Sequence, residues 1–277
     1  MKPITSIATV VPVLVLSLFS IPAAAQWINY PTAGTPRTSD GKPNLAAPAP
    51  RARNGKPDLS GVWQIPYEDL IRESAQADPV LARILKEQVG PNLEFWMPRG
   101  AEIPMLPSAQ ALFKQRSGNF GAGRPSERCL PHGIPDAMTT APFRLVQTPG
   151  MTFVLYEEFN HYRQIFTDGR PFPKDPTPAW FGYSIGKWVG STFVVDSQGF
   201  NDQTWLDDYG HPHTDALHTT ERFRRADFGH MEFQITIDDP KAYAKPWSAT
   251  LNFKLLPDTE LIEDVCDNEQ DHRHAVK

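Results

Sequence analysis

Apolar and polar residues alternate regularly through the second half of the chain, from residue 143 to residue 255. The alternation is clearest over 231–237 and 248–255, where every second side chain is apolar or small. A period of two is typical of a β-strand with one buried and one solvated face. Turn sequences such as Pro149-Gly150 and Pro257-Asp258 separate these segments. We therefore expect successive hairpins, the last of them pairing 248–255 with 260–266.

Eight or nine short strands at this spacing favour a closed barrel, because closure leaves no exposed strand edge. The expected fold class is mainly β: an antiparallel barrel with long loops. Helical spacing appears only in an N-terminal insertion at about 67–118, with candidate helices over 67–89 and 107–116. Residues 59–277 would then form a single domain.

The N-terminus predicts export. Lys2 precedes an apolar run over 7–21, and Ala23-Ala24-Ala25 supplies an A-x-A cleavage site. These features describe a signal peptide over residues 1–25, hence a periplasmic or secreted protein with no membrane attachment after cleavage. A membrane anchor is the alternative, but the run is shorter than the ~20 residues that a span needs.

Residues 26–58 form a Pro-rich segment that we interpret as an extended, weakly ordered leader. It contains a near-repeat, in which residues 40–45 (DGKPNL) return as residues 54–59 (NGKPDL). Each copy has the composition of a tight turn. The repeat therefore predicts two similar turns that lay the leader on the surface of the domain.

Composition and motifs exclude several classes of function. The net charge of −5 carries no basic stripe, which argues against nucleic acid as a partner. The sequence contains no P-loop, dinucleotide fingerprint or Gly-x-Ser-x-Gly elbow. Cys129 and Cys266 are the only cysteines, and in an oxidising compartment they predict one disulfide, with two buried thiols as the alternative. The oligomeric state stays open.

Two resemblances follow from short motifs. Gly61-Val62-Trp63 resembles the opening motif of lipocalins and the wider calycin barrels, which implies a barrel whose closed end is plugged by Trp63. A lipocalin continues directly into its barrel, whereas this chain enters a helical insertion. The set GKPDLSGVW, FTDGR, GYSIGKWVG, WLDDYGHPH and ERF resembles a family of secreted bacterial proteins. That resemblance covers nearly all of the mature chain, and it implies no particular activity.

Glu221 is the most informative residue of the predicted barrel. It shares a strand face with Leu217, Thr219 and Phe223. Burial of an isolated carboxylate is costly unless it is paired or protonated. Other polar residues on apolar faces are Glu157, Arg163, Tyr183 and Glu263.

These residues suggest acid–base chemistry in a barrel cavity. Glu221 and Glu263 would act as acid and base, Tyr183 as an orienting hydroxyl, and His211 as an assisting group from a loop. The residues expected to bind the substrate are Arg163 as anion anchor, Glu157, Tyr162 and Phe223. The leading hypothesis is a cofactor-independent lyase or isomerase for a small, partly aromatic or apolar molecule. Phenolic acid decarboxylases offer a fold-level analogy only.

Three alternatives remain open. The first is a structural domain, in which Glu221 and Arg163 form an ion pair across the barrel; this explains the two residues equally well. The second is a non-catalytic carrier of apolar ligands. The third is a metal-dependent enzyme in which His211, His213 and Asp207 hold the ion. Arg128 and His132, which flank Cys129, are interpreted as polar loop residues and not as ligands.

Overall fold

The computed structural model describes residues 30–71, 92–119 and 121–266. The signal peptide over 1–25, most of the first candidate helix and the tail from residue 267 lie outside the described residues. No helix within the described ranges is long and apolar enough to cross a membrane. The second candidate helix is confirmed as α3, Pro107–Ser117.

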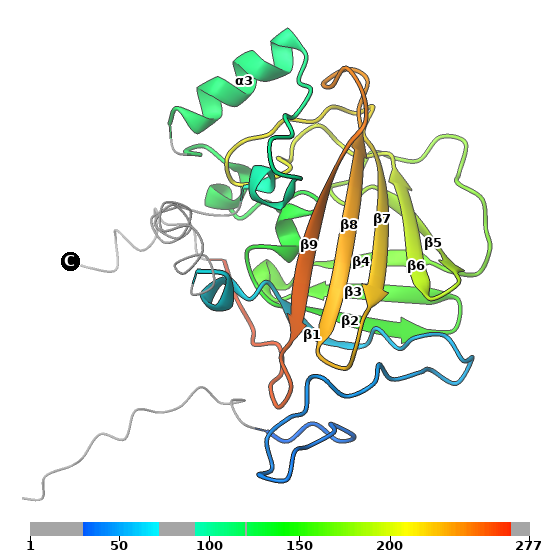
Figure 1. Ribbon diagram of the computed structural model, residues 1–277. Helices are drawn as coiled ribbons and strands as arrows, with labels where there is room; N and C mark the ends of the chain where they lie inside the picture. Colours follow the sequence, from blue (N-terminus) through cyan, green and yellow to red (C-terminus); the bar gives the residue numbers. More distant parts are fainter. Residues whose placement is uncertain (1–29, 72–91, 120, 267–277) are drawn as a thin grey trace, which may run out of the picture.

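A closed β-barrel forms the body of the protein, as the alternation predicts (Figure 1). The described residues supply nine strands: β1 Gly61–Gln64, β2 Phe143–Thr148, β3 Met151–Tyr156, β4 Tyr162–Phe166, β5 Tyr183–Val189, β6 Thr192–Gln198, β7 His218–Arg225, β8 His230–Asp238 and β9 Trp247–Leu255. They pair in chain order, and β9 returns to β1 through Trp63 and Leu255.

The barrel departs from the predicted pairing in two places. Strands β4 and β5 are parallel, because the Pro-rich connection over 167–182 carries the chain back to the end of the barrel where β4 began. The predicted strand over 260–266 is wrong, since residues 256–266 have no regular structure. Asp258, with a φ of 61°, turns the chain away from the sheet, and its carboxylate accepts hydrogen bonds from Arg37 of the leader.

Aromatic side chains fill much of the barrel interior. Phe143, Phe253, Phe233, Phe223 and Phe193 are buried, and consecutive members of this series have ring centroids 4.8–6.2 Å apart. Gly186 on β5 makes room for the last ring, because a Cβ there would lie 2.6 Å from Phe193. This part of the barrel is therefore a packed core.

Trp63 lies at the closed end, as the Gly-x-Trp motif implies. Its side chain is fully buried, its Nε1 donates to the carbonyl of Leu59 at 2.9 Å, and the guanidinium of Arg225 lies 4.9 Å from its ring. Arg225 in turn donates to the carbonyl of Asp58. Trp63 and Arg225 thus close this end of the barrel, and their side-chain nitrogens donate hydrogen bonds to backbone carbonyls.

The leader packs against the same end. Its two repeats form matching turns, closed by the bridges Arg37–Pro43 and Arg51–Pro57, which confirms the prediction of two similar turns. The carbonyls of Leu45 and Ala47 accept hydrogen bonds from the β7–β8 turn. These hydrogen bonds attach the leader to this end of the barrel.

The opposite end of the barrel is covered by irregular segments that we call the cap: the described part of 92–142, together with 199–217 (Figure 1). The cap contains α3 and three 3₁₀ helices, η1 Leu93–Trp96, η2 Pro125–Arg128 and η3 Asp136–Met138. A fourth, η4 Glu158–Asn160, follows β3. The predicted disulfide between Cys129 and Cys266 is confirmed, and it ties the cap to the end of the described chain.

Candidate functional site in the cap

Arg163 and Glu221 meet inside the barrel. Two guanidinium nitrogens of Arg163 donate to the two carboxylate oxygens of Glu221 at 2.6 and 2.9 Å, and further bonds reach Ser184 and Ser197. The side chains are 1% and 0% exposed. Burial opposes the charge of Arg163, but Glu221 outweighs it and keeps the pKa of Arg163 above its ordinary value. This geometry supports the structural ion pair.

The other residues predicted to line a barrel site do not join this pair. Glu263 is exposed on the irregular segment after β9. Glu157 and Tyr183 lie on the outer side of the sheet, and Tyr162 is 61% exposed there. Phe223 belongs to the aromatic core. The described structure therefore does not assemble Glu221, Glu263 and Tyr183 around a common point.

The error lies in the choice of strand face. Strand β3 is largely apolar on both sides, so its alternation does not say which side is buried. The inner side carries Thr152, Val154 and Tyr156, which places Glu157 outside. On β5 the inner position is Ser184, and Tyr183 instead stacks on Phe166 on the outer surface.

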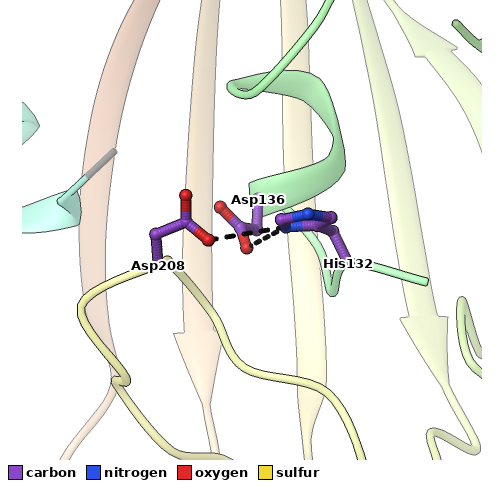
Figure 2. A group of neighbouring side chains, drawn as sticks. All are labelled: His132, Asp136 and Asp208. Atoms are coloured by element: carbon purple, nitrogen blue, oxygen red, sulfur yellow. Dashed lines mark hydrogen bonds and ion pairs between the residues drawn. The ribbon is translucent and has the colours of Figure 1, made fainter. Parts of the chain in front are cut away.

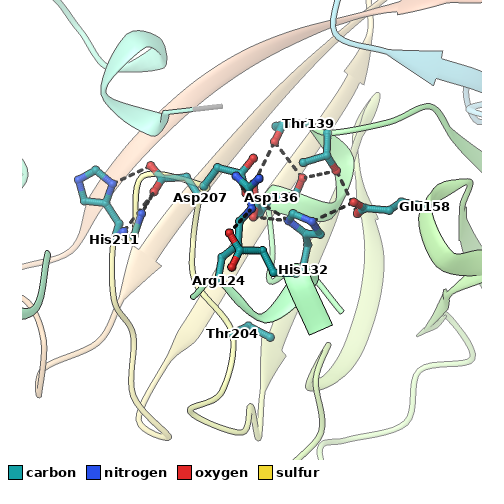
Figure 3. A network of polar contacts seen from close by, with 12 residues as sticks. Arg124, His132, Asp136, Thr139, Glu158, Thr204, Asp207 and His211 are labelled. Atoms are coloured by element: carbon teal, nitrogen blue, oxygen red, sulfur yellow. Dashed lines mark hydrogen bonds and ion pairs between the residues drawn. The ribbon is translucent and has the colours of Figure 1, made fainter. Parts of the chain in front are cut away.

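Asp207 organises the cap. Its carboxylate accepts hydrogen bonds from the backbone N–H groups of Leu93, Gly210 and His211, and it lies 2.6 Å from Nδ1 of His211. Gly210 has a φ of +99° and lies against the Arg116 side chain, so this tight turn favours glycine. Asp207 thus fixes both the loop and the orientation of the His211 imidazole (Figure 3).

Among the described residues, the second nitrogen of His211 has no hydrogen-bond partner. Nε2 is buried and lies 3.7 Å from a carboxylate oxygen of the half-exposed Glu94, while the ring stacks on Phe113 of α3 at 4.1 Å. Burial lowers the pKa of His211, but Asp207 and Glu94 outweigh it and raise that pKa to about 9. Contact with His211 lowers the pKa of Glu94. The pair is therefore an imidazolium and a carboxylate at neutral pH.

A second Asp–His pair lies beside the first (Figure 3). Nδ1 of His132 lies 2.6 Å from Oδ2 of Asp136, and its Nε2 lies 2.9 Å from Oε1 of Glu158. Burial lowers the pKa of His132, but Asp136 and Glu158 outweigh it and raise that pKa to about 11. His132 is thus held between two carboxylates.

Asp208 completes this group (Figure 2). Its Oδ1 lies 3.8 Å from Nδ1 of His132 and 3.4 Å from Nη1 of Arg124, but accepts no hydrogen bond from the part of the chain that the structure describes. Burial, together with the nearby charge of Asp136, raises the pKa of Asp208 to about 8. Gly133 allows the segment that carries His132 to lie close to the segment that carries Asp208, since a Cβ at Gly133 would lie 2.1 Å from the carbonyl of Trp205.

His213 does not share the environment of His211. Its Nε2 lies 2.6 Å from the hydroxyl of Thr204 and its Nδ1 3.1 Å from the carbonyl of Thr214, and burial lowers its pKa. The two histidines therefore serve different partners, which disfavours the predicted metal set with Asp207. Among the described residues, the group with metal-ligand spacing is His132, Asp136 and Asp208.

A cavity of about 430 Å³ lies between α3 and the segment 122–130. Arg116 stacks over Trp205 in its wall, 4.4 Å from the ring, and donates to the carbonyl of Gly210. Arg128 and Leu130 line the same space. The cavity thus combines an aromatic face with two guanidinium groups, next to the loop that carries His211.

Sequence reasoning missed Glu94 and Asp136, and it interpreted His132 as a polar loop residue. One signal was present, because both Asp–His pairs have a spacing of four residues: His132 with Asp136, and Asp207 with His211. The meeting of the two segments in space had no signature along the chain. Comparisons with protein-family models, curated proteins and solved structures give no match.

Proposed function

We propose that the protein is an exported enzyme that moves a proton within a small, partly aromatic molecule, with His211 and Glu94 as the reacting pair. The observation that carries the proposal is the geometry of His211: Nδ1 is fixed by Asp207, and the buried Nε2 has no hydrogen-bond partner. An imidazole oriented at one nitrogen and available at the other is the arrangement of an enzymatic acid or base.

The charges assign the two roles. The Glu94 carboxylate would remove a proton from a carbon next to a carbonyl, and the His211 imidazolium would donate one at the other end of the conjugated system. The product is then an isomer of the substrate. A direct transfer from Glu94 to His211, whose nearest atoms are 3.7 Å apart, would restore the starting protonation. An elimination would use the same pair, so a lyase belongs to the same proposal.

The neighbouring cavity supports the substrate class. Arg116 and Arg128 supply positive charge for a carboxylate, and Trp205, whose ring lies against the Arg116 guanidinium, supplies an aromatic wall. In this role Arg116 replaces Arg163, which is occupied by Glu221. Helix α3 covers His211 through Phe113 and also lines the cavity. A movement of α3 would therefore open a path from the cavity to His211.

Export is part of the proposal. Support comes from the signal-peptide pattern of residues 1–25 and from the Cys129–Cys266 disulfide, which fits an oxidising compartment.

The test is proton exchange in D₂O, followed by ¹H NMR with a panel of aryl ketones, aryl keto acids and unsaturated aromatic acids. Wild-type protein should exchange or isomerise at least one compound, and His211→Gln should slow this by about 10²–10⁴-fold. His213→Gln is the matched control, because His213 is buried in the same loop but has both nitrogens bonded. Equal rates in the two variants, or no exchange by the wild type, would contradict the proposal.

A carrier of small aromatic anions is the second candidate, and the cavity beside Trp205 is the observation that favours it. A carrier would bind such compounds with the same affinity after His211→Gln, and it would catalyse no exchange. Quenching of tryptophan fluorescence measures the affinity.

A further inference from the structure

We infer that His132, Asp136 and Asp208 form a binding site for a divalent transition-metal ion, with Zn²⁺ as the first candidate. The site lies in the cap, next to the His211–Asp207 pair, but it does not rest on the function proposed for that pair. It also differs from the set of His211, His213 and Asp207 that the sequence suggested.

Geometry is the first argument. One potential ligand atom from each of the three side chains lies within 4.8 Å of the other two. Ligands that share one tetrahedral ion at about 2.0–2.2 Å lie about 3.3–3.6 Å from each other, so the 2.6 Å contact between His132 Nδ1 and Asp136 Oδ2 would lengthen by about 1 Å when the ion binds. The three side chains are only 3–8% exposed, and Figure 2 shows them pointing toward one another from two separate segments.

The surroundings of His132 are the second argument. A histidine that binds a metal through one nitrogen usually donates its other N–H to a carboxylate, which fixes the ring and strengthens the ligand. Here Nε2 lies 2.9 Å from Glu158, which leaves Nδ1 to face Asp136 and Asp208. The hydroxyl of Thr140 donates to the other oxygen of Glu158 at 3.2 Å. The arrangement behind the ring is therefore already that of a metal ligand.

Asp208 supplies the third and independent argument. Its side chain is 8% exposed, and Oδ1 accepts no hydrogen bond from the described residues although it faces Nδ1 of His132 and Nη1 of Arg124. Buried carboxylate oxygens normally have a hydrogen-bond partner, so this oxygen keeps a lone pair that a cation can use. A cation bound between this oxygen, His132 and Asp136 would satisfy it.

Charge balance agrees with this assignment. Three buried or half-buried carboxylates (Asp136, Glu158 and Asp208) surround His132, and Arg124 lies 3.4 Å from Asp208. With the three carboxylates ionised and His132 neutral, as metal ligation requires, Arg124 leaves two negative charges that a divalent ion offsets. One nitrogen and two carboxylate oxygens suit Zn²⁺ or a neighbouring transition metal better than Mg²⁺ or Ca²⁺, which prefer oxygen alone.

A metal-free ion-pair network is the competing explanation. In that case His132 is an imidazolium that donates from both nitrogens to Asp136 and Glu158, and added metal has no position to occupy. The two explanations predict opposite outcomes in a binding experiment.

The experiment is a titration of the mature protein, stripped with chelator and dialysed, with Zn²⁺ and separately with Co²⁺. We expect one equivalent of Zn²⁺ by elemental analysis after desalting, and the visible absorption bands of tetrahedral Co²⁺. Glu158→Gln should weaken binding about 10–100-fold, as is usual for the carboxylate behind a ligating histidine. Asp208→Asn, which removes a ligand at nearly constant volume, should weaken it further.

His211→Gln is the matched control, since it removes a buried histidine of the same cap that lies outside the proposed ligand set, and it should bind Zn²⁺ as the wild type does. Circular dichroism melting establishes that each variant is folded. Failure of the wild type to retain Zn²⁺ would overturn the site whatever the variants do. Equal affinity of wild type and a folded Asp208→Asn variant would also overturn it. Neither outcome bears on the proton-exchange assay of His211.

Discussion

Inside the barrel, the charged atoms of Arg163 and Glu221 bond to each other and to two serines. In the cap, Asp208 Oδ1 and His211 Nε2 are also enclosed, but neither forms a hydrogen bond with a described residue. Both regions bury charge, and the two sets of charged groups differ in their hydrogen bonds. The Arg163–Glu221 pair, whose charged atoms are fully bonded, maintains structure, whereas a buried charged group that keeps an atom without a hydrogen bond can take a ligand or a substrate.

The largest expected effect tests the barrel side of this comparison. Glu221→Leu leaves the Arg163 guanidinium buried and unpaired, and should lower the free energy of unfolding by about 3–5 kcal/mol. Combining it with Arg163→Met removes both charges and should recover most of the loss. Urea unfolding of both variants measures the two values. A cost below about 1 kcal/mol for Glu221→Leu would mean that the pair is not structural.

The next effect concerns the pH dependence of stability in the cap. The folded-state pKa of His211 is raised from its ordinary value near 6.5 to about 9. Its contribution to stability is therefore fully present below pH 6.5 and is lost as the pH rises to about 9, with an upper limit of about 3 kcal/mol.

Unfolding of wild type and His211→Gln between pH 6 and 10 isolates this contribution. His132, whose pKa is also raised, remains in both proteins, so the difference between the two curves belongs to His211. The wild type should lose its advantage between pH 6.5 and 9. Parallel curves would show that His211 is not charged in the folded protein.

The smallest effect tests how closely the two cap segments approach. Gly133→Ala would place a Cβ against the carbonyl of Trp205, so one segment must shift. Overpacking of this kind costs about 1–3 kcal/mol. Thermal melting measures the cost. A second readout is Zn²⁺ affinity, which should fall because His132 moves relative to Asp208, whereas Gly190→Ala, which strains the β5–β6 turn at a φ of +61° away from the cap, should leave it unchanged.

The barrel was predictable from the sequence because its information is local. Alternation over β8 and β9, the turn at Pro149-Gly150 and the motif at Trp63 each act within a few residues. Two features needed more than local information. The parallel pairing of β4 and β5 depends on the path of a long loop, and the fate of residues 260–266 depends on Asp258 and its contact with Arg37.

The candidate site was predictable only in part. The sequence pointed to the loop of Asp207 and His211, and it identified Glu221 as a carboxylate on a core face. It did not reveal that Arg163 satisfies that carboxylate, because the two residues are 58 positions apart. It also gave no sign that His132 and Asp136 approach Asp208, since a contact between two irregular segments leaves no periodicity. A polar residue on a core face therefore predicts a buried polar group. Only the fold shows which of these groups keep an atom without a hydrogen-bond partner.

One measurement tests the division between barrel and cap most directly. The proton-exchange rate of the first responsive compound is measured by ¹H NMR in His211→Gln and in the double variant Arg163→Met with Glu221→Leu, side by side. We predict that exchange is lost in the first protein and retained in the second. Loss in the folded double variant with retention in His211→Gln would place the chemistry in the barrel and contradict the account.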